Sequence, residues 1–110
     1  MPRIDPRLTV EVDGMAKVAE SSQEHRFSRV GDAHKHARHY ARYVHRTFLV
    51  WRDKEGRGVA APASVEHLET MLAEMDDDER PCTYYGVDCM IISREIGEIM
   101  LANHRVGVPC

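Results

Sequence analysis

The chain has 110 residues and a mass of 12.6 kDa, which is the size of a single domain, residues 1–110, with one core. Its 43% hydrophobic and 30% charged residues are those of a folded protein, and no apolar run approaches the ~20 residues that cross a bilayer. The net charge of −3 hides an asymmetry, because residues 1–57 hold 12 Lys and Arg against 8 Asp and Glu, whereas residues 58–110 hold 3 against 10.

The N-terminal stretch MPRIDPRLTVEVDG contains two prolines and no apolar core segment, so we expect no secretory signal and a cytoplasmic protein. Within it, Leu8, Val10 and Val12 alternate with polar residues, which predicts a strand over residues 7–13 with one wet face. Residues 15–28 show no clear period. Their first part, AKVAESSQEH, can form a short helix or a loop, and HRFSRV can form a second strand.

A helix is predicted from Asp32, which can cap its N-terminus, to about Arg46. Its apolar residues recur at steps of three and four and define one stripe that faces the core. These residues are Ala33, Ala37, Tyr40, Ala41 and Val44.

A β-hairpin is predicted next, with strands over residues 47–52 and 58–61 joined by the turn-forming DKEGRG. Ser64 can then cap a second helix, because a seam of apolar residues follows at helical spacing. The seam consists of Val65, Leu68, Leu72 and Met75.

A strand over residues 82–87 and a final helix capped by Asp88 complete the prediction. Five residues of that helix are expected to share one face: Ile92, Ile96, Ile99, Met100 and Asn103. No repeat or linker divides the chain. The order of elements therefore predicts an α+β fold, in which a small, mostly antiparallel sheet of 3–5 strands packs against about three helices.

Histidines are dense between residues 34 and 45, but only His36 and His39 have the spacing that two zinc ligands on one helix need. The cations around them would repel a divalent ion, so a solvated face is the simpler interpretation. A second candidate zinc set lacks the close C-x2–4-C spacing of a structural site. It consists of Cys82, Cys89, His104 and Cys110. We expect no metal, no cofactor and reduced thiols.

The sequence lacks the motifs that frame a catalytic nucleophile or a bound nucleotide, and we therefore expect a protein that is not an enzyme. Triplets such as Cys89, His104 and Asp88 arise by chance in a chain with seven histidines.

The helix around residues 33–46 carries cations on the side opposite its alanine stripe, and like charges at this spacing oppose helix formation slightly. Either the acidic half of the protein neutralises them, internally or across a dimer, or they form a docking face for an anionic partner. The candidate contact residues are Lys35, Arg38, Arg42 and Arg46.

The acidic run EMDDDER supplies a separate candidate contact region, although a solvated loop is the simpler interpretation. Its candidate residues are Asp76, Asp77, Asp78 and Glu79. These four carboxylates can imitate a row of phosphates and occupy a basic groove of a partner.

A small chain with two opposed charge patches and no catalytic motif is typical of a protein that docks onto a larger macromolecular complex and inhibits or modulates it. The partner is expected to be a protein or a nucleoprotein complex and not a membrane, and a homodimer stays open. Phage-type inhibitors such as the anti-CRISPR proteins have this size and character, and an immunity or antitoxin protein fits nearly as well. No residue motif assigns the chain to any of them.

A nucleic-acid-binding regulator is the alternative, with the basic helix facing phosphates and Tyr43 and His45 available for stacking or hydrogen bonds. The overall pI of about 6.1 and the lack of a known nucleic-acid-binding signature count against it.

Overall fold

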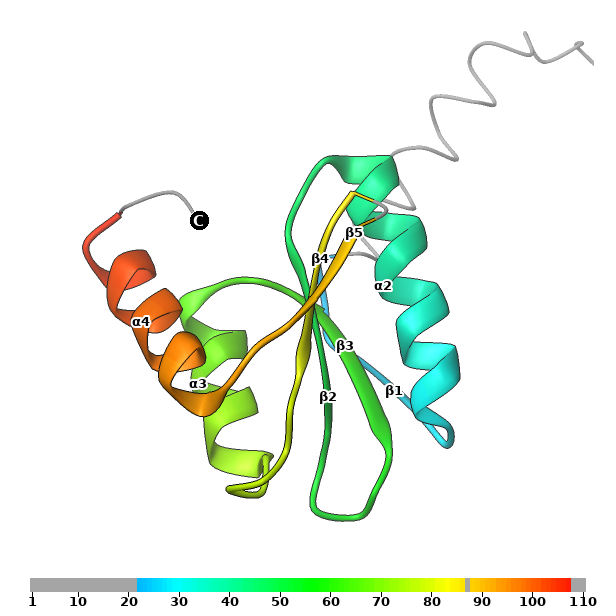
Figure 1. Cartoon of the computed structure of the whole chain (residues 1–110). Helices are drawn as coiled ribbons and strands as arrows, with labels where there is room; N and C mark the ends of the chain where they lie inside the picture. The colour runs from blue at the N-terminus through cyan, green and yellow to red at the C-terminus, as the bar shows by residue number, and fades with distance from the viewer. Residues whose placement is uncertain (1–21, 87, 108–110) are drawn as a thin grey trace, which may run out of the picture.

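The computed structural model describes residues 22–86 and 88–107. The prediction of a strand over residues 7–13 lies outside these residues. In the described part, a five-stranded sheet lies between helix α2 on one side and helices α3 and α4 on the other (Figure 1). The predicted α+β class, with its antiparallel sheet and about three helices, is confirmed. The elements are β1 (His25–Phe27), α2 (Val30–Val44), β2 (Phe48–Arg52), β3 (Gly58–Pro62), α3 (Val65–Glu74), β4 (Cys82–Tyr85), β5 (Asp88–Ile91) and α4 (Arg94–Arg105).

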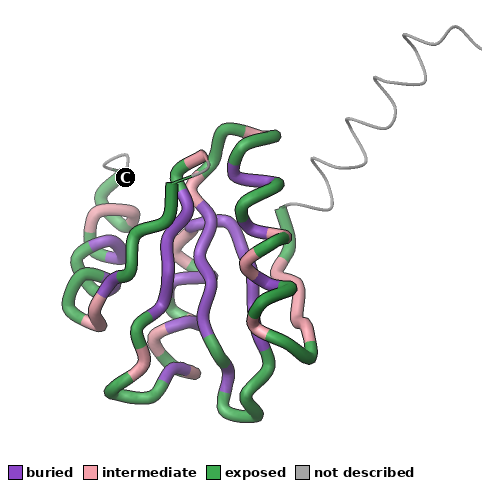
Figure 2. The backbone as a smooth tube through the Cα atoms, turned by 45° about the vertical axis from the view of Figure 1, so that its right-hand side comes forward, coloured by how far each residue is buried: buried purple, intermediate pink, exposed green. Residues whose placement is uncertain are grey.

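The strands are ordered β1-β3-β2-β4-β5, and each neighbouring pair is antiparallel. The β2–β3 hairpin occupies the middle of the sheet, with Val50 opposite Ala60 and Trp51 opposite Val59. The pairing of β2 with β3 confirms the predicted hairpin. Apart from Arg52, every residue of these two strands is buried, so both faces of the central sheet lie in the interior (Figure 2).

One face of the sheet is covered by α2, whose alanines allow a close approach of helix and strand. Ala33, Ala37 and Ala41 are fully buried, as the predicted stripe requires. A Cβ atom added to Gly58 on β3 would lie 2.5 Å from the Cα atom of Val30 and 3.0 Å from the Cβ atom of Ala33. Glycine at this position is therefore what permits α2 to lie directly on β3.

The other face is covered by α3, and α4 packs against α3. Trp51 and Leu49 of β2 form this second core with Leu68 and Met71 of α3. The Ser64 side chain accepts a hydrogen bond from the backbone N–H of His67, so the predicted cap is confirmed. The seam is wider than predicted, because Met71 and His67 are buried as well.

Two predicted helix starts are wrong. Helix α2 begins at Val30, with Arg29 at the N-cap position, and Asp32 lies inside its first turn. Asp88 does not cap a helix either, because Ser93 caps α4 and accepts a hydrogen bond from the N–H of Ile96.

Residues 88–91 form a strand where the helix was predicted to begin, because the left-handed Gly86 lets the chain turn back along β4. The shared face predicted for the last helix is wrong as a result. Gly97, Met100 and Leu101 face the core, whereas Ile96 and Ile99 are exposed.

Replacing Gly58 with alanine should lower the free energy of unfolding by about 1–3 kcal/mol, because the added methyl group meets backbone atoms that cannot move aside freely. Gly31→Ala is the matched control, since a Cβ atom at Gly31 meets nothing within 4 Å and alanine favours the helix. Urea unfolding measures both. Equal stability of the two variants would contradict the close packing of α2 on β3.

Candidate interaction surface

The outward side of α2 carries a cationic face, which we define as Lys35, Arg38, Arg42 and Arg46. All four residues are exposed. The first three lie on α2 itself, at positions turned away from its buried alanines. Arg46 follows the helix, after His45, which has a left-handed φ of 54°. It lines a depression of about 440 Å³ together with Ser64 and His104.

The cationic face has no internal neutralisation among residues 22–86 and 88–107, since none of its four residues forms an ion pair there. Four other arginines do pair with carboxylates, namely Arg26, Arg57, Arg94 and Arg105. Four further exposed cations without an ion pair are spread over separate positions: Arg29, Arg52, Lys54 and Arg80. Of the eight exposed cations without an ion pair among the described residues, three therefore lie together on α2: Lys35, Arg38 and Arg42.

His34 does not add to this charge at neutral pH. Its Nδ1 atom lies 2.7 Å from the hydroxyl of Tyr84 on β4. Burial, reinforced by the positive charge of Arg52, lowers the pKa of His34, and burial together with Cys89 raises the pKa of Tyr84 to about 12. The hydrogen bond between the Tyr84 hydroxyl and the neutral His34 imidazole fixes α2 to β4.

The two histidines that had the spacing of metal ligands face different surroundings. The ring of His36 packs toward β1, 4.6 Å from the ring of His25 and 5.4 Å from that of Phe27. The exposed His39 is stacked on Tyr43, with 6.1 Å between ring centroids. His36 and His39 therefore do not form a common pair of ligands.

A shallow depression beside His39 and Tyr43 is completed by Arg42. Sequence reasoning missed this grouping, although His39 and Tyr43 are four residues apart on one helix and spacing alone places them together. Two stacked rings next to a guanidinium offer a flat surface and a positive charge to a ligand.

The acidic run lies on the other side of the sheet, in the connection between α3 and β4 (Figure 1). It follows the last turn of α3, which ends at Glu74. Arg94 of α4 donates to the carbonyl oxygens of Leu72 and Met75, both at 3.1 Å, and lies 3.8 Å from the carboxylate of Asp77. The structure thus keeps the acidic run apart from the cationic face.

The candidate zinc residues are divided between the sheet and α4. Cys82 is buried on β4 and Cys89 is exposed on β5, and both are free thiols. Burial, together with contact to Cys89, raises the pKa of Cys82 to about 12, so this thiol is protonated at neutral pH. His104 lies on α4, and Cys110 falls outside the described residues. Over the described stretches, no three His, Cys, Asp or Glu side chains gather closely enough to hold a metal ion.

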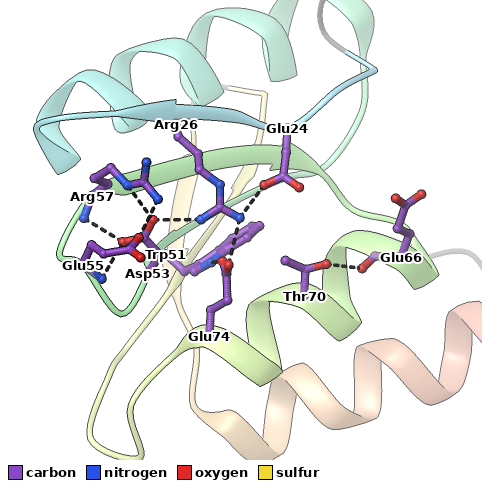
Figure 3. Close-up of polar contacts among 9 residues, drawn as sticks. All are labelled: Glu24, Arg26, Trp51, Asp53, Glu55, Arg57, Glu66, Thr70 and Glu74. Carbon is purple, nitrogen blue, oxygen red and sulfur yellow. Dashed lines mark hydrogen bonds and ion pairs between the residues drawn. The ribbon is translucent and has the colours of Figure 1, made fainter.

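A cluster of ion pairs that sequence reasoning missed joins β1 to α3 (Figure 3). Arg26 donates to Asp53 at 2.8 Å, to Glu74 at 2.8 Å and to Glu24 at 2.6 Å. The indole N–H of Trp51 donates to the same Glu74 carboxylate at 3.0 Å. These contacts hold the edge strand β1 against α3, and no local pattern in the sequence reveals them.

Asp53 is the buried centre of this cluster, and its side chain is 2% exposed. Burial by itself would raise the pKa of this carboxyl. Hydrogen bonds from the backbone of Arg57 and from the side chain of Arg26 outweigh that effect, so the pKa lies below its ordinary value. The carboxylate is therefore ionised and fully engaged within the protein.

Within residues 22–86 and 88–107, no helix combines the length and apolar character that a membrane span needs. Comparisons of the chain with models of protein families, with curated proteins and with solved structures give no match.

Asp53→Asn should reduce stability by about 1–2 kcal/mol at neutral pH, because Arg26 then loses a buried charged partner. The wild type has the higher free energy of unfolding above the unfolded-state pKa of Asp53, about 3.9, and this difference disappears as the pH falls through the lower pKa of the folded state. Urea unfolding of the wild type and the variant at about pH 7 and about pH 2 measures the difference in the free energy of unfolding. Glu55→Gln, at a carboxylate that is 68% exposed, is the control and should change stability little. A gap of equal size at both pH values would contradict this account of Asp53.

Proposed function

We propose that this chain is a docking protein without catalytic activity, which binds a larger macromolecular complex through the cationic face and inhibits or modulates it. The supporting observation is that Lys35, Arg38 and Arg42 stand exposed along one helix, unpaired within the described part of the chain. The chain has 18 acidic residues, yet its described ion pairs engage other cations.

Keeping like charges together on a helix costs a few tenths of a kcal/mol per pair. An anionic partner removes that repulsion and adds charge-assisted hydrogen bonds. The free energy of binding such a partner is therefore more favourable than for a surface of interspersed positive and negative charges. The acidic run on the other side of the sheet makes the molecule electrically two-sided. Such a charge distribution orients a protein as it approaches a charged partner and raises the association rate.

The polar groups with shifted pKa values support a role in docking rather than in catalysis. Asp53 is engaged by Arg26 and Arg57, and Tyr84 is engaged by His34. These groups hold elements of the fold together, and each forms hydrogen bonds with other parts of the same chain.

The partner that we favour is an acidic protein surface or a nucleoprotein complex in the cytoplasm. The role of a phage-type inhibitor, such as an anti-CRISPR protein, or that of an immunity or antitoxin protein accords with this mode of action. In this proposal the acidic run, Asp76, Asp77, Asp78 and Glu79, is a second and separate contact.

Direct binding of nucleic acid is the second candidate, and the stacked rings of His39 and Tyr43 beside Arg42 favour it. Bases stack on such side chains while the cations face the phosphates. The net charge of −3 opposes this function, because a polyanion is repelled by the chain as a whole.

The double variant Lys35→Glu/Arg42→Glu should weaken partner binding by roughly tenfold or more, which corresponds to about 1.4 kcal/mol. The matched control is Arg52→Glu/Lys54→Glu, because it exchanges the same residue types at exposed positions outside both α2 and the acidic run. The immobilised full chain is used to capture partners from a native lysate, with and without nuclease, and mass spectrometry quantifies a defined captured complex.

Loss of the complex with the α2 variant but not with the control, in the presence of nuclease, supports docking on protein. Loss of the complex on nuclease treatment of the wild type supports nucleic-acid binding instead. Equal capture by the two variants would remove the cationic face as the contact. Asp76→Lys/Asp78→Lys tests the second contact in the same assay, because it leaves the pair between Asp77 and Arg94 intact.

A further inference from the structure

Two cysteines of the β4–β5 hairpin lie on one face of the sheet. Cys89 of β5 is opposite Tyr84 of β4. Cys82, two residues before Tyr84, is opposite Ile91. Opposite residues of an antiparallel pair share a face, as do residues two positions apart on one strand. Cys82 and Cys89 are therefore diagonal neighbours on the face that α2 covers, where Cys82 and Tyr84 belong to the core.

The backbone pairing brings this diagonal close. The N–H of Ile92 donates to the carbonyl oxygen of Pro81 at 2.8 Å, so these two residues form a hydrogen-bonded pair. Because the two kinds of pair alternate, both cysteines belong to non-hydrogen-bonded pairs, in which opposite Cα atoms are about 4.5 Å apart. The right-handed twist of the strands shortens one of the two diagonals between such pairs. The contact of the Cys82 thiol with Cys89 shows that this is the shorter one.

The two thiols differ in their access to solvent. Cys89 is exposed, whereas Cys82 is buried and retains 9% of its accessible surface. An oxidant in solution therefore meets Cys89 first, because thiol–disulfide exchange begins with attack by an accessible sulfur. An exposed thiol in contact with a second, protected thiol is the arrangement of an attacking and a resolving cysteine.

We propose that Cys82 and Cys89 are a redox-active pair, which a low-molecular-weight disulfide of the glutathione type converts into a disulfide bond between β4 and β5. Cys89 gives its proton to water and attacks one sulfur of the oxidant, which releases a thiolate and leaves a mixed disulfide on Cys89. Cys82 gives its proton to that thiolate and attacks the Cys89 sulfur, which releases the second thiolate. This thiolate takes up the proton that Cys89 gave to water. Two cysteine thiols are thereby oxidised, and the S–S bond of the oxidant is reduced to two thiols.

The position of β5 allows the adjustment that a disulfide bond requires. Among the described strands, β5 is the last in the sheet and pairs with β4 alone. All four of its residues are exposed. A disulfide needs Cβ atoms about 3.8 Å apart, and a strand at the edge of a sheet can shift toward this distance with little disturbance of the core.

The redox state of the pair acts on the contact between β4 and α2. Cys89 also contacts the hydroxyl of Tyr84, which is hydrogen-bonded to His34 on α2. Closure removes the S–H group of Cys89 from this contact and joins β5 covalently to β4. The inference is independent of the proposed function, because the reacting groups include no residue of the cationic face.

Mass spectrometry of the native full chain in glutathione buffers tests the proposal. The variant Cys110→Ser retains Cys82 and Cys89 as its two thiols, and oxidation should lower its mass by about 2 Da with no glutathione retained. Cys82→Ser/Cys110→Ser should instead retain one glutathione on Cys89, because the resolving thiol is missing. In the wild type, cleavage after Tyr85 should leave the fragments that contain Cys82 and Cys89 joined until a reductant is added.

The equilibrium constant for closure shows whether the fold positions the two thiols. In Cys110→Ser, the equilibrium constant for closure by glutathione disulfide should be roughly tenfold or more larger in the native protein than in denaturing urea. The reason is that the native hairpin already holds the two thiols in contact.

Four results overturn the proposal: absence of closure in Cys110→Ser, with or without retained glutathione; an equilibrium constant no larger in the native protein than in urea; a bond between Cys89 and Cys110 in the wild type; or a bond that joins two chains. If Cys82→Ser/Cys110→Ser fails to fold, the fragments of the wild type and the equilibrium constant of Cys110→Ser decide without it.

Discussion

The central hairpin of β2 and β3 carries apolar side chains on both faces, and each face needs its own cover. Phe48 and Val50 face α2, whereas Leu49 and Trp51 face α3. Alanines on α2 and the glycine at position 58 bring helix and sheet into direct contact on the first face. The buried residues of α2, namely Ala33, Ala37, Tyr40 and Ala41, all lie on that side, so the opposite side of the helix remains in water with its charged residues and Tyr43.

This three-layer arrangement also separates the charged groups by role. Arg26 donates hydrogen bonds to Asp53, Glu74 and Glu24, and thereby attaches the short edge strand β1 to α3. Arg94 closes the C-terminal end of α3 by binding its last carbonyl oxygens. The cations that stabilise the fold are thus those with partners, whereas Lys35, Arg38 and Arg42 on α2 form no ion pair within the described residues. The layers also place Lys35, Arg38 and Arg42 of α2 on one side of the sheet and the acidic run on the other.

Much of the local structure could be predicted, because local chemistry determines it. The DKEGRG turn, the Ser64 cap and the alanine stripe of α2 each depend on residues a few positions apart. The prediction that residues 88–91 begin a helix is wrong, because an apolar stretch fits a helix as well as a strand. These residues form a strand because they pair with β4, and that pairing depends on the turn at Gly86. Strand order and the Arg26 cluster join residues up to 48 positions apart, which periodicity does not encode.

The candidate surface could likewise be predicted as far as local spacing determines it, but not where it depends on contacts between distant parts of the chain. Helical spacing alone turns Lys35, Arg38 and Arg42 away from the alanines. Whether a carboxylate of the same chain reaches them depends on where the acidic residues lie in the fold, and the described structure has none within ion-pair distance. Arg46 shows the limit of the spacing argument, because the left-handed His45 ends the helix before it.

The central claim is that the guanidinium groups of α2 are available to an anionic ligand, whereas those that stabilise the fold are not. The most direct measurement follows the Nε–Hε NMR resonances of the arginines while inorganic pyrophosphate is added to the full chain. The account predicts saturable shifts for Arg38 and Arg42 and no shift for Arg26 or Arg94. Shifts of equal size at Arg26 or Arg94, or none at Arg38 and Arg42, would contradict it.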